Sequence, residues 1–206
     1  IGEATLYLGD CLEILPTLAG IDAVVTDPPY GLGVEYGSYE DSREALAALA
    51  RAWIAAAKGV SERIVCTPGV TNLWLYPEPS WTACWAISGA GARGKWGFNC
   101  WQPILCYGAD PYLKRGLGAR PDLLFVNEVS EKNGHPCPKP LGFMERLIER
   151  ATLDGETVLD PFMGSGTTGV ACARLGRRFI GVEIEPRYFD IACRRIEDAQ
   201  RQGDMF

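Results

Sequence analysis

Short apolar runs alternate with helical patterns along this chain of 206 residues, and this alternation restricts the fold more than any other feature of the sequence. The runs expected to form strands lie at 5–8, 22–26, 63–67, 82–87, 103–107, 156–159 and 178–182. The patterns expected to form helices lie at 11–18, 43–58, 141–151, 167–175 and 186–202. Apolar strands separated by helices are typical of a parallel sheet covered on both faces. We therefore expect one α/β domain over 1–206, doubly wound around a mostly parallel sheet.

A glycine-rich segment follows the strand expected at 156–159, where α/β sheets bind their ligands. Segment 160–169 reads DPFMGSGTTG, and its glycines allow a tight turn and close approach of a ligand to the amides at a helix N-terminus. Glu183 ends the next strand, where a carboxylate can accept hydrogen bonds from both ribose hydroxyls. We interpret the two as half of a nucleoside-cofactor site. The glycine spacing also suits NAD, and a tight turn without a ligand is the simpler alternative.

Asp27, Pro28, Pro29 and Tyr30 follow the strand expected at 22–26. The carboxylate and the Pro28 carbonyl are two acceptors that suit an exocyclic amino group with two N–H donors. The ring of Tyr30 suits a flat heterocycle. The simpler alternative is a proline-rich end to a strand, with the tyrosine packed on the surface.

A third segment, GHPCPKP at 134–140, precedes the helix expected at 141–151. Its prolines have a nearly fixed φ, so they could hold Lys139 near an anionic group. A solvated lysine in a plain loop is the alternative.

The composition excludes several classes of protein. No stretch approaches the ~18 consecutive apolar residues of a membrane span, and a hydrophobic content of 47% argues against disorder. No basic leader precedes an apolar run, so the eight cysteines are expected to be buried hydrophobes in a reducing cytoplasm. They form no C-x-x-C pair, and the single histidine, His135, has no close partner except Cys137. We therefore expect no metal site.

Together these segments resemble the amino-group DNA methyltransferases that use S-adenosylmethionine, in the circularly permuted order called the beta class. The resemblance rests on short segments that follow the family's order: LGDC at 8–11, DPPY at 27–30, WQPIL at 101–105 (glutamine replacing the family's glutamate), HPCPKP at 135–140, DPFMGSGTT at 160–168 and GVEI at 181–184. It implies a Rossmann-like methyltransferase fold, circularly permuted, that transfers a methyl group to the exocyclic amino group of a DNA base.

The resemblance also implies roles for individual residues. The catalytic residues would be Asp27, Pro28, Pro29 and Tyr30, with Tyr30 stacked on a base that has left the double-stranded DNA. Asp10 would hold the cofactor adenine, Glu183 the ribose, and the glycine-rich loop the methionine carboxylate. The complete implied cofactor-binding set is Asp10, Cys11, Asp27, Lys139, Asp160, Phe162, Gly164, Ser165, Gly166, Thr167, Thr168 and Glu183.

Several alternatives stay open at this point. Family habit favours adenine N6, although cytosine N4 satisfies the same two acceptors. An inactive DNA-binding or assembly subunit with a vestigial cofactor pocket is a third hypothesis. A cytosine-C5 enzyme using Cys137, or a nicotinamide oxidoreductase, would leave DPPY at 27–30 without a role.

The net charge of −6 argues against a protein that coats nucleic acid, but the charge is unevenly distributed. Segment 91–121 holds five basic residues against Asp110 alone, a local charge of +4. We expect 88–132 to be a shortened target-recognition insertion that forms a basic lip with modest DNA affinity. A segment this short suggests a short recognition sequence, a homodimer or a partner. The predicted DNA-binding residues are Arg93, Lys95, Lys114, Arg115 and Arg120.

Overall fold

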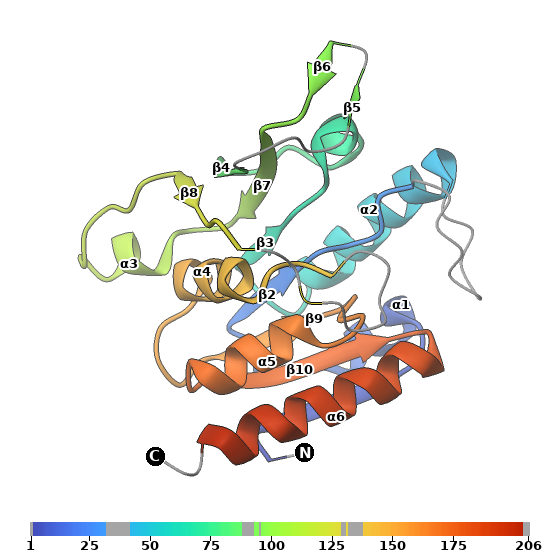
Figure 1. Cartoon of the computed structure of the whole chain (residues 1–206), viewed down its shortest axis with the longest axis vertical. Helices are drawn as coiled ribbons and strands as arrows, with labels where there is room; N and C mark the ends of the chain where they lie inside the picture. Colours follow the sequence, from blue (N-terminus) through green and yellow to red (C-terminus); the bar gives the residue numbers. More distant parts are fainter. Residues whose placement is uncertain are drawn as a thin grey trace.

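The computed structural model describes residues 2–31, 42–87, 93–94, 96–128, 131 and 138–203. Its main sheet has eight strands in the order β1-β10-β9-β2-β3-β7-β4-β8 (Figure 1). β7 runs antiparallel to both of its neighbours, and the other neighbouring strands are parallel. The strands are β1 (Ala4–Leu8), β2 (Ala23–Thr26), β3 (Ile64–Cys66), β4 (Trp81–Ala86), β7 (Trp101–Tyr107), β8 (Leu123–Phe125), β9 (Thr157–Asp160) and β10 (Arg178–Glu183). The predicted α/β fold with a mostly parallel sheet is confirmed.

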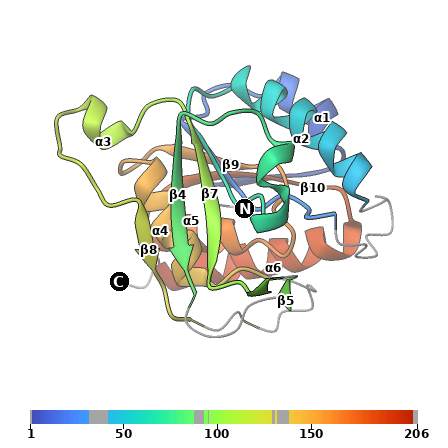
Figure 2. The same ribbon diagram turned by 90° about the horizontal axis from the view of Figure 1, so that it is seen from above.

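Helices cover both faces of this sheet. α1 and α2 lie on one face, and α4, α5 and α6 lie on the other (Figure 2). The helices are α1 (Cys11–Ile14), α2 (Arg43–Lys58), α3 (Pro111–Lys114), α4 (Leu141–Ala151), α5 (Thr167–Arg174) and α6 (Pro186–Gly203), with 3-10 helices η1 (Leu15–Thr17) and η2 (Val70–Leu75). The helices expected at 43–58 and 141–151 have these bounds in the structure, whereas the one expected at 11–18 divides into α1 and η1.

Local sequence explains why α2 begins and ends where it does. The Ser42 hydroxyl accepts a hydrogen bond from the Ala45 amide (3.2 Å), which caps the first turn, and Gly59 follows the last turn. The apolar residues of α2 recur at helical spacing, so they form one stripe that is buried against the sheet. The buried stripe consists of Leu46, Ala50, Trp53, Ile54 and Ala57.

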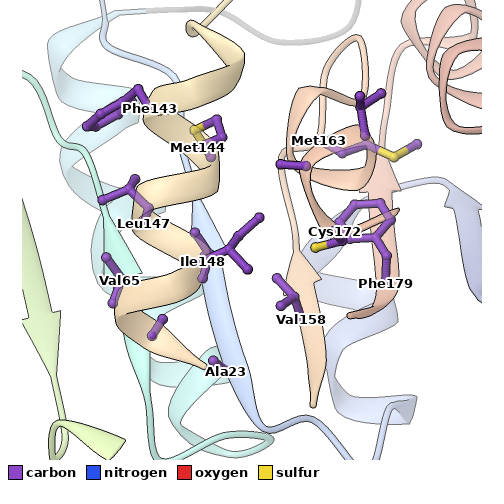
Figure 3. Packing of buried hydrophobic residues seen from close by; sticks show 14 of the residues in the cluster. Ala23, Val65, Phe143, Met144, Leu147, Ile148, Val158, Met163, Cys172 and Phe179 are labelled. Carbon is purple, nitrogen blue, oxygen red and sulfur yellow. The ribbon is translucent and has the colours of Figure 1, made fainter. Parts of the chain in front are cut away.

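The opposite face of the sheet is covered by α4, which packs over β2 and β3. Figure 3 shows its buried side chains beside Ala23 and Val65 of these strands. Phe143 stacks on Trp85 of β4, with ring centroids 4.0 Å apart. Burying side chains of this size contributes about 1.5–3 kcal/mol each, so α4 fixes the positions of the central strands. The buried side chains of α4 include Phe143, Met144, Leu147 and Ile148.

The sheet order places three distant segments at one edge. β9 pairs in parallel with both β2 and β10, although about 130 residues of sequence separate β2 from β9. The carboxyl ends of these strands are therefore neighbours, and they carry Asp27, Asp160 and Glu183. We call this side of the sheet the carboxyl edge.

The first and last segments of the chain lie together (Figure 1). A Cβ added to Gly2 would lie 2.3 Å from Oε1 of Gln200 in α6. Adjacent chain ends are the condition under which circular permutation is tolerated. The permuted order inferred from the sequence stays a prediction.

The structure also contains elements that the periodicity did not predict. These are η2, α3, β8 and a hairpin of β5 (Arg93–Gly94) and β6 (Gly97–Phe98). The hairpin joins the end of β4 to the start of β7, so it lies at the carboxyl edge, and it projects from the body in Figure 1. Among the helices of the described ranges, none is long and apolar enough to cross a membrane.

Candidate active site

An open pocket lies at the carboxyl edge, where α/β sheets bind ligands. It is lined by the segments that follow β2, β9 and β10, by the turn after β1 and by the residues that precede α4. The predicted site residues that line it are Asp10, Cys11, Asp27, Pro28, Pro29, Tyr30, Lys139, Asp160, Phe162, Gly164, Ser165, Thr167, Thr168 and Glu183. Gly166 is the one member of the predicted cofactor set that does not line it.

The Asp27 carboxylate is held by three side chains. Its Oδ1 atom accepts hydrogen bonds from the hydroxyls of Tyr30 (2.6 Å) and Thr67. Its Oδ2 atom lies 2.5 Å from the ammonium nitrogen of Lys139. The Asp27 side chain remains 22% exposed, so the carboxylate is fixed in position while still open to a ligand.

Lys139 lies beside the Asp27 carboxylate. Its ammonium bonds Asp27 and also lies 4.7 Å from the centre of the Tyr30 ring, a cation–π contact. The sequence predicted an anionic partner for this lysine, and the family resemblance included it in the cofactor-binding set. In the structure the anion that it contacts is Asp27, and its contact with a cofactor stays a prediction.

The turn after β3 supports both Asp27 and Tyr30. Besides the bond from Thr67, the Asn72 side-chain amide donates hydrogen bonds to the carbonyls of Tyr30 (2.7 Å) and Pro68 (3.2 Å). Gly69 has a φ of +77°, and a Cβ there would lie about 3.5 Å from the Tyr30 ring. The sequence did not predict a role for these residues. The one feature that could have indicated it is that TPG at 67–69 follows a strand next to β2.

Asp160 connects β2 to the glycine-rich loop. Its carboxylate accepts hydrogen bonds from the hydroxyls of Thr26 (2.6 Å) and Thr168 (2.5 Å) and from the Phe162 amide (3.0 Å). Because the carboxylate is fully buried, its pKa is raised from 3.8 to about 6, although these donors partly offset the effect of burial. Asp160 lines the pocket, but the bonds of its carboxylate are to the protein itself.

Glu183 fastens the glycine-rich loop to the end of β10. One carboxylate oxygen accepts from the Gly164 amide and the other from the Glu185 amide, each at 2.8 Å. Burial raises the pKa of this carboxyl above its ordinary value. The two oxygens have four lone pairs between them, so the predicted bonds to a ribose are compatible with this arrangement.

Gly166 is required by the backbone and by packing. Its φ is +80°, and an added Cβ would lie 2.9 Å from Cβ of Ala192 in α6. Arg195 of α6 also donates a hydrogen bond to the carbonyl of Ser165 (2.6 Å). The loop is therefore held from behind by α6. Its other side faces the pocket, where α5 begins without a side-chain cap.

The turn after β1 contributes Asp10 and Cys11 to the pocket. Oδ1 of Asp10 caps α1 by accepting a hydrogen bond from the Leu12 amide (2.8 Å). Burial, followed by the charge of Asp10, raises the pKa of the Cys11 thiol to about 12. This thiol is protonated at neutral pH and is therefore no nucleophile.

Comparison with known proteins identifies the family. The sequence profile described as DNA methylase (N6_N4_Mtase) matches residues 68–194, which is more than half of the chain. This chain is a member of that DNA methylase family.

Individual relatives of this chain agree with the family match. The Type II methyltransferase M2.DpnII of Streptococcus pneumoniae is 54% identical over 63 residues, which span 31% of this chain and 24% of that protein. The structure of the M1.HpyAVI–SAM complex has a TM-score of 0.66 and 25% identity, over 93% of this chain and 99% of that one. The cytosine-N4-specific PvuII DNA methyltransferase has a TM-score of 0.73 at 18% identity, over 97% and 92% of the two chains, and shows the fold alone.

Three of the basic residues predicted to contact DNA lie far from the pocket. They form ion pairs at the opposite, amino-terminal edge of the sheet, because β7 runs antiparallel and carries the chain away from the carboxyl edge. The expected basic lip is therefore not built beside the pocket by these three residues, and their role in DNA binding stays a prediction. The ion pairs are Lys114–Glu62 (3.5 Å), Arg115–Glu156 (3.9 Å) and Arg120–Asp110 (3.6 Å).

Some sequence predictions lie outside the described residues. These include Lys95, the side chain of Arg93, and His135 and Cys137 of the HPCPKP segment. Within the described ranges, no three His, Cys, Asp or Glu side chains form a group that could hold a metal ion.

Proposed function

We propose that this chain transfers a methyl group from S-adenosylmethionine to the exocyclic amino group of a DNA base, with adenine N6 as the preferred acceptor. The observation that carries the proposal is the juxtaposition of Asp27 with the glycine-rich loop in one pocket. Family membership sets the reaction class, and this geometry supplies the groups that the reaction needs.

The charges of the pocket suit this cofactor. Among the described residues, four carboxylates line it, from Asp10, Asp27, Asp160 and Glu183, against the single ammonium of Lys139. Such a surface favours a ligand with sulfonium and ammonium cations. The uncapped N-terminus of α5 presents amide donors to the ligand's one carboxylate. When bound, S-adenosylmethionine supplies an electrophilic methyl group.

The acceptors after β2 suit the amine. Its lone pair is delocalised into the base, so the nitrogen is a weak nucleophile. Asp27 and the Pro28 carbonyl, which accepts no hydrogen bond within the described part of the chain, would accept its two N–H groups and localise that lone pair. The nitrogen then bonds to the methyl carbon as the methyl–sulfur bond breaks. The electron pair stays on sulfur, and the excess proton on nitrogen passes to water.

Holding the amine in line with the methyl group supplies much of the rate. Well-oriented reactants gain up to ~7–11 kcal/mol over free ones. The three hydrogen-bond donors on Asp27 give this site such a fixed orientation. Because Asp27 lies recessed in the pocket, a base in double-stranded DNA has to rotate out of the helix to reach it.

The hairpin β5–β6 supports a DNA-facing role for segment 88–132, within a single catalytic domain over 1–206. It lies at the same edge as Asp27. Trp96 between its strands is fully exposed, and Phe98 is more than half exposed. Exposed aromatic rings stack on nucleobases without sequence preference. A homodimer that completes DNA recognition, and a cytoplasmic location, remain predictions from the sequence.

A labelled-methyl assay tests the proposal. The chain is incubated with tritiated S-adenosylmethionine and double-stranded DNA of mixed sequence. The nucleosides of the product DNA are then identified by mass spectrometry. We expect N6-methyladenine. N4-Methylcytosine would move the acceptor to cytosine, and no incorporation into any DNA would contradict the proposal. Asp27→Ala serves as the control, because it should abolish transfer while S-adenosylmethionine still binds.

A further inference from the structure

The two oxygens of the Asp27 carboxylate are not equivalent. Oδ1 accepts two hydrogen bonds, from the hydroxyls of Tyr30 and Thr67, which use both of its lone pairs. Among the described residues, only the Lys139 ammonium donates to Oδ2, which therefore keeps one lone pair. A substrate N–H can therefore reach a free acceptor site only on Oδ2.

We propose that Thr67 is a positioning residue that, together with the Tyr30 hydroxyl, orients Asp27 so that Oδ2 accepts the N–H of the target amine. This inference rests on the proposed function and assigns the geometry within it. Thr67 acts through Asp27 and needs no contact with the base or the cofactor. The Tyr30 hydroxyl thereby has a role of its own, separate from the stacking role of the ring.

Thr67 is well placed for this role. It is fully buried, and its backbone amide bonds the carbonyl of Thr26, the residue just before Asp27. A β-branched side chain has few rotamers, so a fixed backbone also fixes the hydroxyl. The same turn holds the Tyr30 carbonyl through Asn72. The turn after β3 thus controls both hydroxyls on Oδ1.

The chemistry of these two donors differs from that of Lys139. Hydroxyls are neutral, so they orient the carboxylate without cancelling its negative charge. That charge stabilises the positive charge that develops on the amine nitrogen as it is methylated. Burial, followed by the charge of Asp27, raises the pKa of the Tyr30 hydroxyl well above its ordinary value. Tyr30 therefore stays protonated and acts as a donor.

Three variants test the inference in the methyl-transfer assay. Thr67→Val keeps the shape and loses the hydroxyl, and Thr67→Ser keeps the hydroxyl. Thr152→Val is the matched control, since Thr152 is equally buried and donates to the Ile148 carbonyl (2.7 Å) at the other edge of the sheet. We expect Thr67→Val to lower kcat about 10- to 100-fold, the effect of a misplaced reacting group. The KM for S-adenosylmethionine should change less than about twofold, because binding does not use Thr67.

The controls separate positioning from structure. Thr67→Ser should restore kcat to within a few-fold of the wild type, and Thr152→Val should lose stability without losing kcat. Tyr30→Phe removes the other hydroxyl from Oδ1, so it gives an independent measurement if Thr67→Val does not fold. In the double variant Thr67→Val/Tyr30→Phe, the fold-loss of kcat should be smaller than the product of the two single fold-losses, because both hydroxyls act on one oxygen.

Two outcomes would overturn the inference. One is a folded Thr67→Val with wild-type kcat, and the other is a Thr67→Ser that is as impaired as Thr67→Val. An inactive wild-type chain would instead contradict the proposed function, and the inference with it. If the wild type is active and Thr67→Val keeps the wild-type kcat, the inference is rejected and the proposed function stands.

Discussion

Lys139 and Asp27 are 112 residues apart in the sequence, and their charged groups meet at 2.5 Å in the pocket. The pair joins the segment before α4 to the end of β2. Lys139 is 13% exposed and also covers the Tyr30 ring, so the ammonium lies at the centre of the candidate active site.

Lys139→Met tests the importance of this ion pair. We expect the variant to lose about 1.5–3 kcal/mol of stability, the usual value of a hydrogen bond to a charged group. It should also lose kcat, because Oδ2 loses the donor that holds it in position. Chemical denaturation and the methyl-transfer assay measure the two effects. Lys58→Met, in the exposed last turn of α2, is the control. A variant with unchanged stability and kcat would contradict a role for the pair.

Asp160 predicts a pH dependence of stability. Its pKa is about 6 in the folded protein and 3.8 in an unfolded chain, so the folded state binds the proton more tightly. Asp160 therefore destabilises the fold progressively as the pH rises from about 4 through 6. The difference between these two pKa values corresponds to about 3 kcal/mol of folding free energy. We expect the stability of the wild type relative to Asp160→Asn to increase as the pH falls from 7 to 4.

Denaturant unfolding of both proteins at each pH measures this difference. Asp154→Asn, an exposed position at the far edge of the sheet, shows how much pH dependence arises elsewhere. A difference between the wild type and Asp160→Asn that stays constant from pH 4 to 7 would contradict the prediction.

Gly166→Ala should weaken both the fold and cofactor binding. The new methyl group would clash with Ala192, and φ is +80°. Gly176→Ala is the matched control, with a φ of +64° and no atom within 4 Å of the added Cβ. The control should lose about 1–2 kcal/mol from backbone strain alone, and Gly166→Ala should lose about 1–3 kcal/mol more from overpacking. Equal losses of stability in the two variants on denaturation would show that packing on α6 is unimportant. Calorimetry with S-adenosylmethionine measures the effect of Gly166→Ala on cofactor binding.

Trp96→Ala should weaken DNA binding. Stacking of an aromatic ring on a base contributes about 1–3 kcal/mol, which corresponds to a 5- to 150-fold rise in Kd at about 1.4 kcal/mol per tenfold. Trp81 is also exposed but begins β4 at the opposite edge, so Trp81→Ala is the control. Fluorescence anisotropy with labelled double-stranded DNA measures both variants. An equal effect of the two would show that the hairpin does not face DNA.

Much of the architecture followed from local sequence. Periodicity and capping predicted α2 and α4 with their observed bounds because these signals act within a few residues. The segments after β2, β9 and β10 were predicted to be functional because strand ends carry ligands in parallel sheets. The hairpin and β8 escaped prediction because two- and three-residue strands carry too little periodicity to be recognised.

The site was predicted less completely than the fold. Thr67 and Asn72 were missed because their role depends on β3 lying beside β2, which no local pattern encodes. Lys114, Arg115 and Arg120 looked like one basic patch in sequence. The antiparallel direction of β7 places them at the far edge, each beside a carboxylate.

The sequence by itself determined the fold class, most of the helices and strands, and the strand-end segments that line the pocket, because those depend on local periodicity and on strand ends. Only the tertiary structure decided which groups touch. The partners of Asp27 come from three segments, and the bond between Thr26 and Asp160 spans 134 residues. Strand order and strand direction set such contacts, because they fix which distant side chains share an edge of the sheet.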